Sequence, residues 1–278
     1  MKKFSVLVCL LALAAALALP AQGEAEDLIR RSVELFRQAR RSRLIVFDPA
    51  EGLQLPESTK RSHRPITAAE RRHILALAQE HRAGLWVLTI LYAGLRPGET
   101  AALSWKDIDF DRNEIHVYKA IESGTKTVKA PKTPAGVRDI PMRQELRDRL
   151  LDAQGCPDDL VFPAPAGGVR SANSLQRLWG SFAHALDLHM GAKVQDGVIT
   201  KHALAPDLTP YCLRHTFCTD LQRAGVPINV AKELMGHANI SVTANIYTHR
   251  DQKVLHSNMA KLNPNGRKPS TKPRPKEL

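Results

Sequence analysis

Aromatic residues make up only 5% of this 278-residue chain, and cysteine occurs only four times. Without a CxxC pair, four scattered cysteines do not make a disulfide scaffold or a cysteine-bound zinc site, and we expect buried, reduced thiols. The sequence also contains no GxxxxGK(S/T) phosphate loop, no GxGxxG turn, no HExxH helix and no GxSxG elbow. These absences argue against nucleotide hydrolysis, dinucleotide binding, zinc-dependent proteolysis and α/β-hydrolase chemistry.

Basic residues outnumber acidic ones, with 40 Lys and Arg against 28 Asp and Glu, which gives a net charge of +12. A hydrophobic content of 43% is enough to bury a core and excludes both wholesale disorder and a polytopic membrane protein. The excess of positive charge favours a polyanionic partner, most simply nucleic acid. Because many soluble proteins are basic without binding nucleic acid, charge alone does not decide the function.

Residues 1–23 form an apolar leader that resembles a secretory signal peptide. Lys2 and Lys3 precede an apolar run from Val6 to Leu19, and Pro20-Ala21-Gln22-Gly23 follows it. The run is shorter than the ~20 apolar residues that a membrane-spanning helix needs. Taken alone, this segment predicts export, and the alternative is an apolar helix that packs on the domain behind it.

The rest of the chain has a predominantly helical pattern. An arginine-rich amphipathic helix and its exit are predicted over 26–47, and Asp48-Pro49 begins a polar linker. Thr67 and Glu70 predict a capping box at the start of a helix that runs to about His81. Further helices are predicted near 85–93, 143–153, 171–187, 210–224, 227–235 and 240–248.

Residues 105–141 change to a pattern that is typical of strands. Ile115-His116-Val117-Tyr118 alternates, and Pro134-Ala135-Gly136 marks a turn. We therefore expect a mainly α fold with a small antiparallel β-sheet, preceded by a helical stub and followed by a disordered basic tail over 263–278. Asp107, Asp109 and Asp111 could hold Mg²⁺, but a solvated acidic loop is the preferred interpretation.

Four short segments combine cationic side chains with one tyrosine. They contain Arg96 in Gly94-Leu95-Arg96-Pro97-Gly98-Glu99, Arg214 in Leu213-Arg214-His215-Thr216, His237 after Gly236, and Tyr247 before Thr248. In this order and with this separation, the segments resemble the catalytic domain of the tyrosine recombinase (phage integrase) family. The resemblance runs from about residue 64 to 261 and includes Lys132 in Pro131-Lys132-Thr133 and the stretch Arg138-Asp139-Ile140-Pro141.

The resemblance implies a role for each of these residues. Arg96 and Arg214 would grip the scissile phosphodiester with two guanidinium forks, and His237 would donate a hydrogen bond to the same phosphate. Lys132 would protonate the leaving 5′ oxygen, and Tyr247 would be the nucleophile that forms a 3′-phosphotyrosyl bond. Because this bond keeps the energy of the phosphodiester, religation needs no ATP, and we expect neither a cofactor nor a metal ion.

Two assignments are open at the level of the sequence. Lys126 and Lys129 are near enough to Lys132 to compete with it as the proton donor. The family usually reads His-x-x-Arg at its second box, whereas here Tyr211 stands three residues before Arg214. A phenol with a pKa of ~10 can hydrogen-bond a phosphate but accepts a proton poorly at neutral pH, so we expect a slowed but chemically complete site. The neighbouring His215 is interpreted as a packed structural residue.

The expected organisation is a leader over 1–23, a remnant of the family's core-binding helix with a linker over 24–63, a catalytic domain over 64–262, and the tail. The expected function is site-specific recombination, the integration or excision of a mobile element by DNA cleavage and rejoining. The alternatives are a DNA-binding remnant that does not recombine, and an exported protein of unrelated role, which only the leader favours.

The resemblance also implies partners. They are double-stranded DNA, further copies of this chain in a synaptic tetramer, and an accessory DNA-bending or excision factor. Because duplex DNA is found in the cytoplasm, we expect the protein to act there and interpret the leader as a fusion or gene-model boundary.

Overall fold

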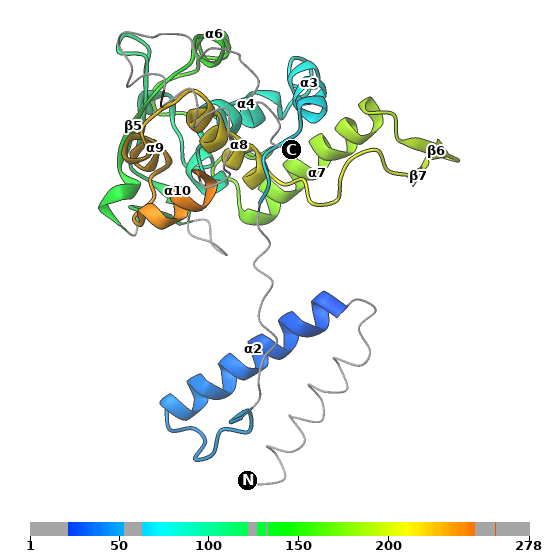
Figure 1. Cartoon of the computed structure of the whole chain (residues 1–278), viewed down its shortest axis with the longest axis vertical. Coiled ribbons are helices and arrows are strands. Elements are labelled where there is room, and N and C mark those ends of the chain that lie inside the picture. Colours follow the sequence, from blue (N-terminus) through cyan, green and yellow to red (C-terminus); the bar gives the residue numbers. More distant parts are fainter. Residues whose placement is uncertain (1–21, 53–62, 122–126, 132, 248–258, 260–278) are drawn as a thin grey trace, which may run out of the picture. The chain divides into compact units, whose positions relative to one another are not determined.

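The computed structural model describes residues 22–52, 63–121, 127–131, 133–247 and 259, and Figure 1 shows its helices and strands. The chain divides into two compact units, Met1–Ser62 and His63–Leu278, called here the N-terminal and C-terminal units. Nearly all of the predicted leader, most of the linker and the predicted basic tail lie outside the described residues. In the part of the chain that is described, no helix combines the length and apolar character needed to cross a membrane.

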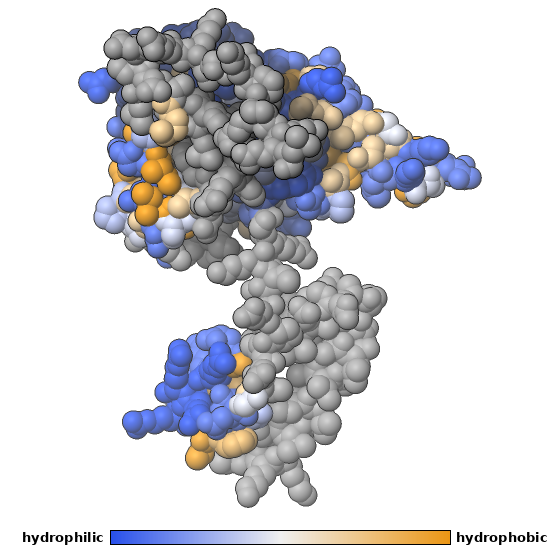
Figure 2. Space-filling model, in the orientation of Figure 1, coloured by the Kyte–Doolittle hydropathy of each residue, from blue (hydrophilic) through white to orange (hydrophobic). Residues whose placement is uncertain are grey.

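The described part of the N-terminal unit is one helix and the turn after it. Helix α2 spans Gln22–Arg41, so it begins four residues before the predicted stretch and ends within it. Asp48 stabilises the turn, because its Oδ1 accepts a hydrogen bond from the backbone N–H of Ala50 (2.9 Å). The described residues of this unit that Figure 2 colours are mostly hydrophilic. Three apolar side chains between the helix and the turn are nevertheless exposed, namely Leu44, Val46 and Phe47.

The C-terminal unit begins with two helices that the sequence predicts. Helix α3 spans Ala68–Leu77 and has the expected capping box: Thr67 Oγ1 accepts from the Glu70 N–H (3.1 Å), and Glu70 Oε2 accepts from the Thr67 N–H (2.7 Å). It ends before the predicted His81. Helix α4, Gly84–Ala93, is buried along most of its length, as its unbroken apolar sequence indicates.

The predicted antiparallel sheet is confirmed and has three strands in the order β1-β2-β5. Strand β2 pairs with β1 through Ile115 and Ile108, and with β5 through Ile115 and Ile140. These isoleucines are buried, and His116 points to the other face, as the alternation of β2 requires. The elements of this region are η1 Trp105–Asp107, β1 Ile108–Asp109, β2 Glu114–Val117, β3 Ala120–Ile121, β4 Val128–Lys129, η2 Pro134–Gly136 and β5 Arg138–Pro141. Strands β3 and β4 form a separate two-stranded pair.

The second half of the C-terminal unit is helical, and its elements are α6 Gln144–Asp152, α7 Ala172–His189, α8 Pro210–Arg223, α9 Ile228–Met235 and α10 Ile240–Tyr247. Helix α8 begins at the predicted cap Thr209 with Pro210 in its first turn. It packs against α4, and α9 and α10 pack against α8 (Figure 1). Trp86, Phe182 and Leu213 are among the largest side chains that this packing buries completely.

The sequence interpretation missed a β-hairpin after α7. Strands β6 Lys193–Gln195 and β7 Val198–Lys201 pair in antiparallel fashion and project from the end of α7 (Figure 1). Asp196 and Gly197 join them with φ of 53° and 77°. An Asp-Gly pair between valines is the signature of a two-residue hairpin turn, so the signal was present in the sequence. Figure 2 shows hydrophilic residues at the projecting end.

Two predictions about individual side chains are wrong. Asp107 is not part of a solvated acidic loop: it is 1% exposed and accepts hydrogen bonds from the Ser104 N–H (2.7 Å) and the Tyr118 hydroxyl (2.6 Å). Lys119 Nζ lies 2.7 Å from Asp107 Oδ2, so Asp107 is a structural carboxylate that is paired with a lysine. Among the cysteines, Cys212 and Cys218 are buried as expected, whereas Cys156 is exposed.

Candidate active site

Arg96 lies between the end of α4 and the start of the short helix α5, Pro97–Thr100. Gly94 ends α4 with a φ of 63°, and a Cβ there would lie 2.3 Å from the Phe217 ring, so only glycine fits. Arg96 then caps α5, where its backbone N–H donates to Glu99 Oε2 (2.7 Å). The Arg96 side chain stays 36% exposed, which makes it the accessible cation of this site.

Glu99 is the centre of the cluster. Its carboxylate, 4% exposed, accepts from Arg96 Nη1 (2.7 Å) and from both terminal nitrogens of Arg138 (3.0 and 2.8 Å), and Arg214 Nη1 lies 4.0 Å away. Burial alone would raise the pKa of Glu99, but the hydrogen bonds and charge of Arg138, with the charges of Arg214 and Arg96, lower it to about 2. Glu99 is therefore a permanent anion that holds three guanidiniums together.

Arg214 is a buried residue of α8, and its side chain contacts the C-terminal end of α9. Its terminal nitrogens donate to the backbone carbonyls of Gly94 and Met235, while Arg96 Nη2 donates to the carbonyl of Gly236 (2.8 Å). Both arginines thus bind carbonyls at a helix C-terminus, where the backbone is electronegative. Burial, followed by the positive charge of Arg96, lowers the pKa of Arg214 to about 9.

His237 follows the left-handed cap Gly236, so it leaves α9 directly beside the arginines. Its Nδ1 lies 2.9 Å from Thr243 Oγ1 on α10, which orients the ring. Burial lowers its pKa to about 4, and the positive charges of Arg214 and Arg96 contribute in the same direction. The ring is therefore neutral at pH 7 and acts as a hydrogen-bonding group.

Tyr211 lies one turn before Arg214 on α8 but, unlike Arg214, is 44% exposed. Its charge in the phenolate form would raise the pKa of Arg214, so the two side chains lie within electrostatic range, as their spacing predicts. The Tyr211 ring stacks on the ring of His63.

The family model described as the phage integrase family matches residues 64–253. The chain belongs to this family. The resemblance seen in the sequence is thereby confirmed, and the cluster around Glu99 lies within the matched residues of the integrase domain.

Curated relatives and solved structures agree with this assignment. The chain is 29% identical over 191 residues to a XerC-like tyrosine recombinase of Caldanaerobacter subterraneus, covering 65% of this chain and 49% of that protein. It is 26% identical to the transposase from transposon Tn916 of Enterococcus faecalis, covering 64% of this chain and 44% of that protein. The chain thus spans about half the length of these relatives.

Among solved structures, the Tn1549 transposon integrase in complex with a circular intermediate DNA has a TM-score of 0.64 at 24% identity, with 90% of this chain and 83% of that chain covered. The structure of XerA recombinase has a TM-score of 0.51 at 20% identity, and the match covers 87% of this chain and 84% of the XerA chain. At these identities the likeness shows the fold, and it confirms the predicted mainly helical integrase fold with small antiparallel sheets.

Of the predicted site residues of this integrase domain, Lys132 is not placed and Tyr247 is placed only by its backbone. Lys132 lies outside the described residues, and so does its competitor Lys126. Lys129, the other competitor, is an exposed residue of β4. Tyr247 is the last residue of α10, but its side chain is not described. Because α10 packs against both α8 and α9, its backbone lies with the helices that carry Arg214 and precede His237.

The sequence interpretation missed two members of the site, Glu99 and Arg138. Arg138 is 5% exposed, and besides its bonds to Glu99 its Nε donates to the Leu234 carbonyl on α9 (2.9 Å). It therefore joins β5 to α5 and α9. A signal for Glu99 was present, since a glutamate three residues after a helix start completes a capping box. For Arg138 the local signal is weaker: on a strand it shares a face with the apolar Ile140, two residues later.

Among the described residues, one group has side chains suited to holding a metal ion. Glu114, His116 and Asp139 share a face of the β2–β5 pair, with ligand atoms within 4.8 Å of one another. His116 Nδ1 already lies 2.6 Å from Asp139 Oδ1, so a cross-strand hydrogen bond explains the arrangement.

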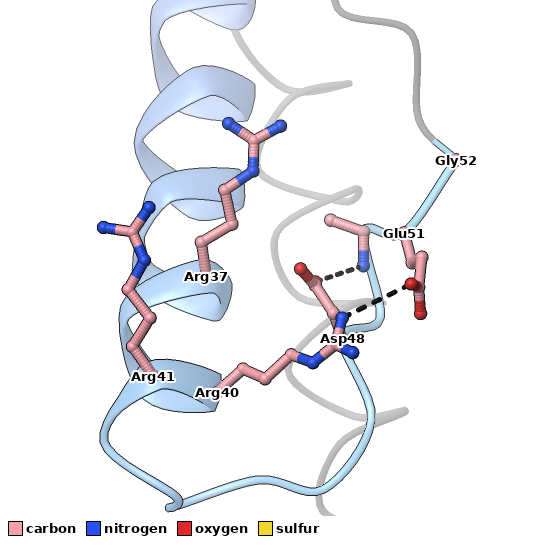
Figure 3. A pocket seen from close by; sticks show the side chains of 7 residues that line it. Arg37, Arg40, Arg41, Asp48, Glu51 and Gly52 are labelled. Carbon is pink, nitrogen blue, oxygen red and sulfur yellow. Dashed lines mark hydrogen bonds and ion pairs between the residues drawn. The ribbon is translucent and has the colours of Figure 1, made fainter.

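A second basic site lies in the N-terminal unit and is shown in Figure 3. Arg37, Arg40 and Arg41 project from α2 beside a shallow pocket that Asp48 and Glu51 also line. Arg40 Nη1 lies 3.3 Å from Glu51 Oε1. Arg37 Nη1 also lies 3.9 Å from Glu34 Oε2 on the same helix, so nearby carboxylates balance the charge of these guanidiniums.

Proposed function

We propose that this chain cleaves and rejoins DNA in site-specific recombination, integrating or excising a mobile element through a 3′-phosphotyrosyl intermediate. The observation that carries the proposal is the charge balance of the cluster. The guanidiniums of Arg96, Arg138 and Arg214 surround one carboxylate, Glu99, and leave two positive charges without an anion among the described residues.

Such an excess of buried positive charge is unfavourable unless an anion joins it. Burial is the largest cause of the lowered pKa values of His237 and Arg214, and the positive charges of the neighbouring arginines lower both further. A phosphodiester supplies one negative charge and acceptor oxygens that match guanidinium forks. Each guanidinium carries five N–H donors, of which the bonds described here use two on Arg96 and two on Arg214. The Arg96 side chain is 36% exposed, so a phosphate can reach its guanidinium, whereas Arg214 would offer N–H donors from a buried position.

The roles follow from this arrangement. Arg96 and Arg214 bind the scissile phosphate and stabilise charge on its oxygens as the phosphorus becomes five-coordinate. His237, held neutral, donates a hydrogen bond, and Tyr211 supplies a further hydroxyl at the exposed edge of the site. Tyr247 attacks the phosphorus, and Lys132 protonates the 5′ oxygen that leaves.

Relatives support the choice of DNA as substrate. The solved Tn1549 integrase is in complex with DNA, and the curated relatives include a transposase and tyrosine recombinases. We further propose that copies of this chain assemble on DNA as a synaptic tetramer, that an accessory DNA-bending or excision factor assists them, and that the reaction takes place in the cytoplasm.

Covalent trapping tests the proposal. The full chain is incubated with a pool of nicked duplexes of randomised sequence and analysed under denaturing conditions. We expect an SDS-resistant protein–DNA adduct, and none from Tyr247→Phe, which keeps the ring but removes the attacking oxygen. Both proteins should shift the duplexes equally in a native gel. A gel shift without any adduct would identify the DNA-binding remnant instead and refute the enzymatic proposal.

A further inference from the structure

The cleavage step of the proposed function requires a proton acceptor, and the arginine cluster does not provide a good one. A tyrosine that attacks a phosphodiester must lose a phenolic proton whose ordinary pKa is ~10. His237 is a weak base, because burial and three arginines lower its pKa to about 4. Tyr211 is itself a phenol. An imidazole outside the positive cluster is the kind of group that can accept this proton near neutral pH.

His63 is such an imidazole, and it lies directly against Tyr211. The two ring centroids are 5.1 Å apart and the rings are nearly parallel, with an interplanar angle of 16°. His63 Nδ1 lies 3.4 Å from Thr209 Oγ1, the cap of α8. When Nδ1 donates to this oxygen, the neutral ring carries its lone pair on Nε2. His63 is exposed, so Nε2 is accessible to a substrate.

The backbone that carries His63 is firmly attached to α3 and α8. The Arg64 guanidinium donates two hydrogen bonds to the Glu70 carboxylate (2.8 and 2.7 Å). It donates two more to the carboxylate of Asp207, in the loop before α8 (2.8 and 3.0 Å). Two residues further on, the Ile66 N–H donates to Thr216 Oγ1 on α8 (2.9 Å). Bidentate arginine–carboxylate pairs are directional. The segment that begins at His63 is therefore placed beside the N-terminal turns of α8, where Tyr211 and Arg214 lie.

We propose that His63 is the proton acceptor of the cleavage step, filling the role that an imidazole at position 211 would otherwise have. The phenolic oxygen of Tyr247 forms a bond to phosphorus while the bond from phosphorus to the 5′ oxygen breaks. The phenolic proton passes to His63 Nε2, and the 5′ oxygen takes a proton from the lysine to become a hydroxyl. Religation runs in reverse, with the His63 imidazolium returning its proton to the phenolate that leaves.

The charged or titratable groups on the elements packed around His63 are Arg64, Glu70, Asp207 and Tyr211. Hydrogen bonds from Arg64 lower the pKa of both carboxylates, so both stay ionised in the pH range where an imidazole titrates. A pH dependence that disappears with His63 therefore belongs to His63.

The test measures the rate of covalent adduct formation by the full chain on nicked duplexes between pH 5.5 and 8.5. His63→Phe keeps a ring to stack on Tyr211 but removes the acceptor. We expect a rate roughly 100-fold lower near neutral pH, loss of the rise with pH, and unchanged DNA affinity in a gel shift. His189→Phe, at an exposed histidine of α7, is the matched control and should keep the natural rate.

A double variant distinguishes loss of the proton acceptor from a structural effect of the His63 substitution. Tyr211→His places an imidazole in the second box, so the double variant His63→Phe with Tyr211→His should recover most of the natural rate. A natural rate and pH profile in His63→Phe would overturn the role of His63 while the proposed function stands. An adduct formed by Tyr211→His but not by the natural chain would also overturn it. No adduct from either protein would refute the proposed function and this inference together.

Discussion

Replacing Glu99 by glutamine should reveal how strongly the arginine cluster depends on its one carboxylate. Glu99→Gln keeps the size and shape of the side chain but removes its charge, which leaves Arg96, Arg138 and Arg214 facing a neutral amide. The amide NH₂ also faces the Arg138 fork, where two donors now meet. Removing one partner of a buried ion pair typically costs about 3–5 kcal/mol.

The pKa of Glu99 gives a second estimate of the same quantity. Its folded value of about 2, against an ordinary 4.5, corresponds to about 3 kcal/mol at roughly 1.4 kcal/mol per pH unit. Because the folded pKa is the lower one, this stability is present above pH 4.5 and is lost as the pH falls from 4.5 through 2. The two estimates agree, and we expect Glu99→Gln to lose about 3–4 kcal/mol near neutral pH.

Urea unfolding followed by circular dichroism measures the effect. With a slope of about 2 kcal/mol per molar urea, the unfolding midpoint should fall by about 1.5–2 M. Between pH 4.5 and 2, the stability of Glu99→Gln should also depend less on pH than that of the natural protein. Glu145→Gln, at an exposed glutamate paired with Arg143, is the control and should cost less than about 1 kcal/mol. A loss below about 1 kcal/mol for Glu99→Gln as well would refute the argument that this carboxylate holds the cluster together.

Three further predictions concern the same site. Arg214→Lys should lower the rate of covalent adduct formation at least about 100-fold, because one ammonium cannot bind the carbonyls of Gly94 and Met235 and the phosphate together. A rate near the natural one would argue against phosphate binding by Arg214. Gly236→Ala should lower the unfolding free energy by about 1–2 kcal/mol or more, because φ is 62° and the added Cβ would lie 2.7 Å from Arg138 Nη1. Calorimetry measures this effect, with Gly180→Ala as the control because a Cβ there meets open space. His237 should titrate near pH 4 in NMR spectra, because burial and the arginine charges lower its folded pKa from 6.5. Stability should therefore fall as the pH drops from 6.5 to 4, since the unfolded chain binds the proton first. A titration near 6.5 would show that the ring is neither buried nor in the field of the arginines.

Several features of this protein are determined by short stretches of sequence. The capping box at Thr67 and Glu70, the cap at Thr209, and the glycines that end α4 and α9 are set by neighbouring residues, because backbone conformation and capping act over a few residues. The alternation around Ile115 likewise predicted a strand, and its apolar residues Ile115 and Val117 are the buried ones. The overlooked hairpin at Asp196-Gly197 belongs to this class, since its turn signal is local.

Identification of the family also came from the sequence, because Arg96, Arg214, His237 and Tyr247 stand in a characteristic order. The order of these four residues does not show which other side chains lie around them in the folded protein. Only the tertiary structure brings Glu99, from α5, and Arg138, from β5, together with Arg214 from α8, and only there does one carboxylate face three guanidiniums.

The same distinction applies to Asp107 and to His63. Asp107 reads as one of three exposed acidic residues, but packing buries it against Ser104 and Tyr118. His63 reads as an unremarkable residue at the end of a linker, and the Arg64 bridge to Asp207 places its ring on Tyr211. Burial and electrostatic environment depend on residues that are distant in the chain, so pKa values and charge balance are properties of the folded protein. The sequence by itself determined the helices, the turns and the family; the folded arrangement decided which charges meet, because the energy of a charge depends on everything packed around it.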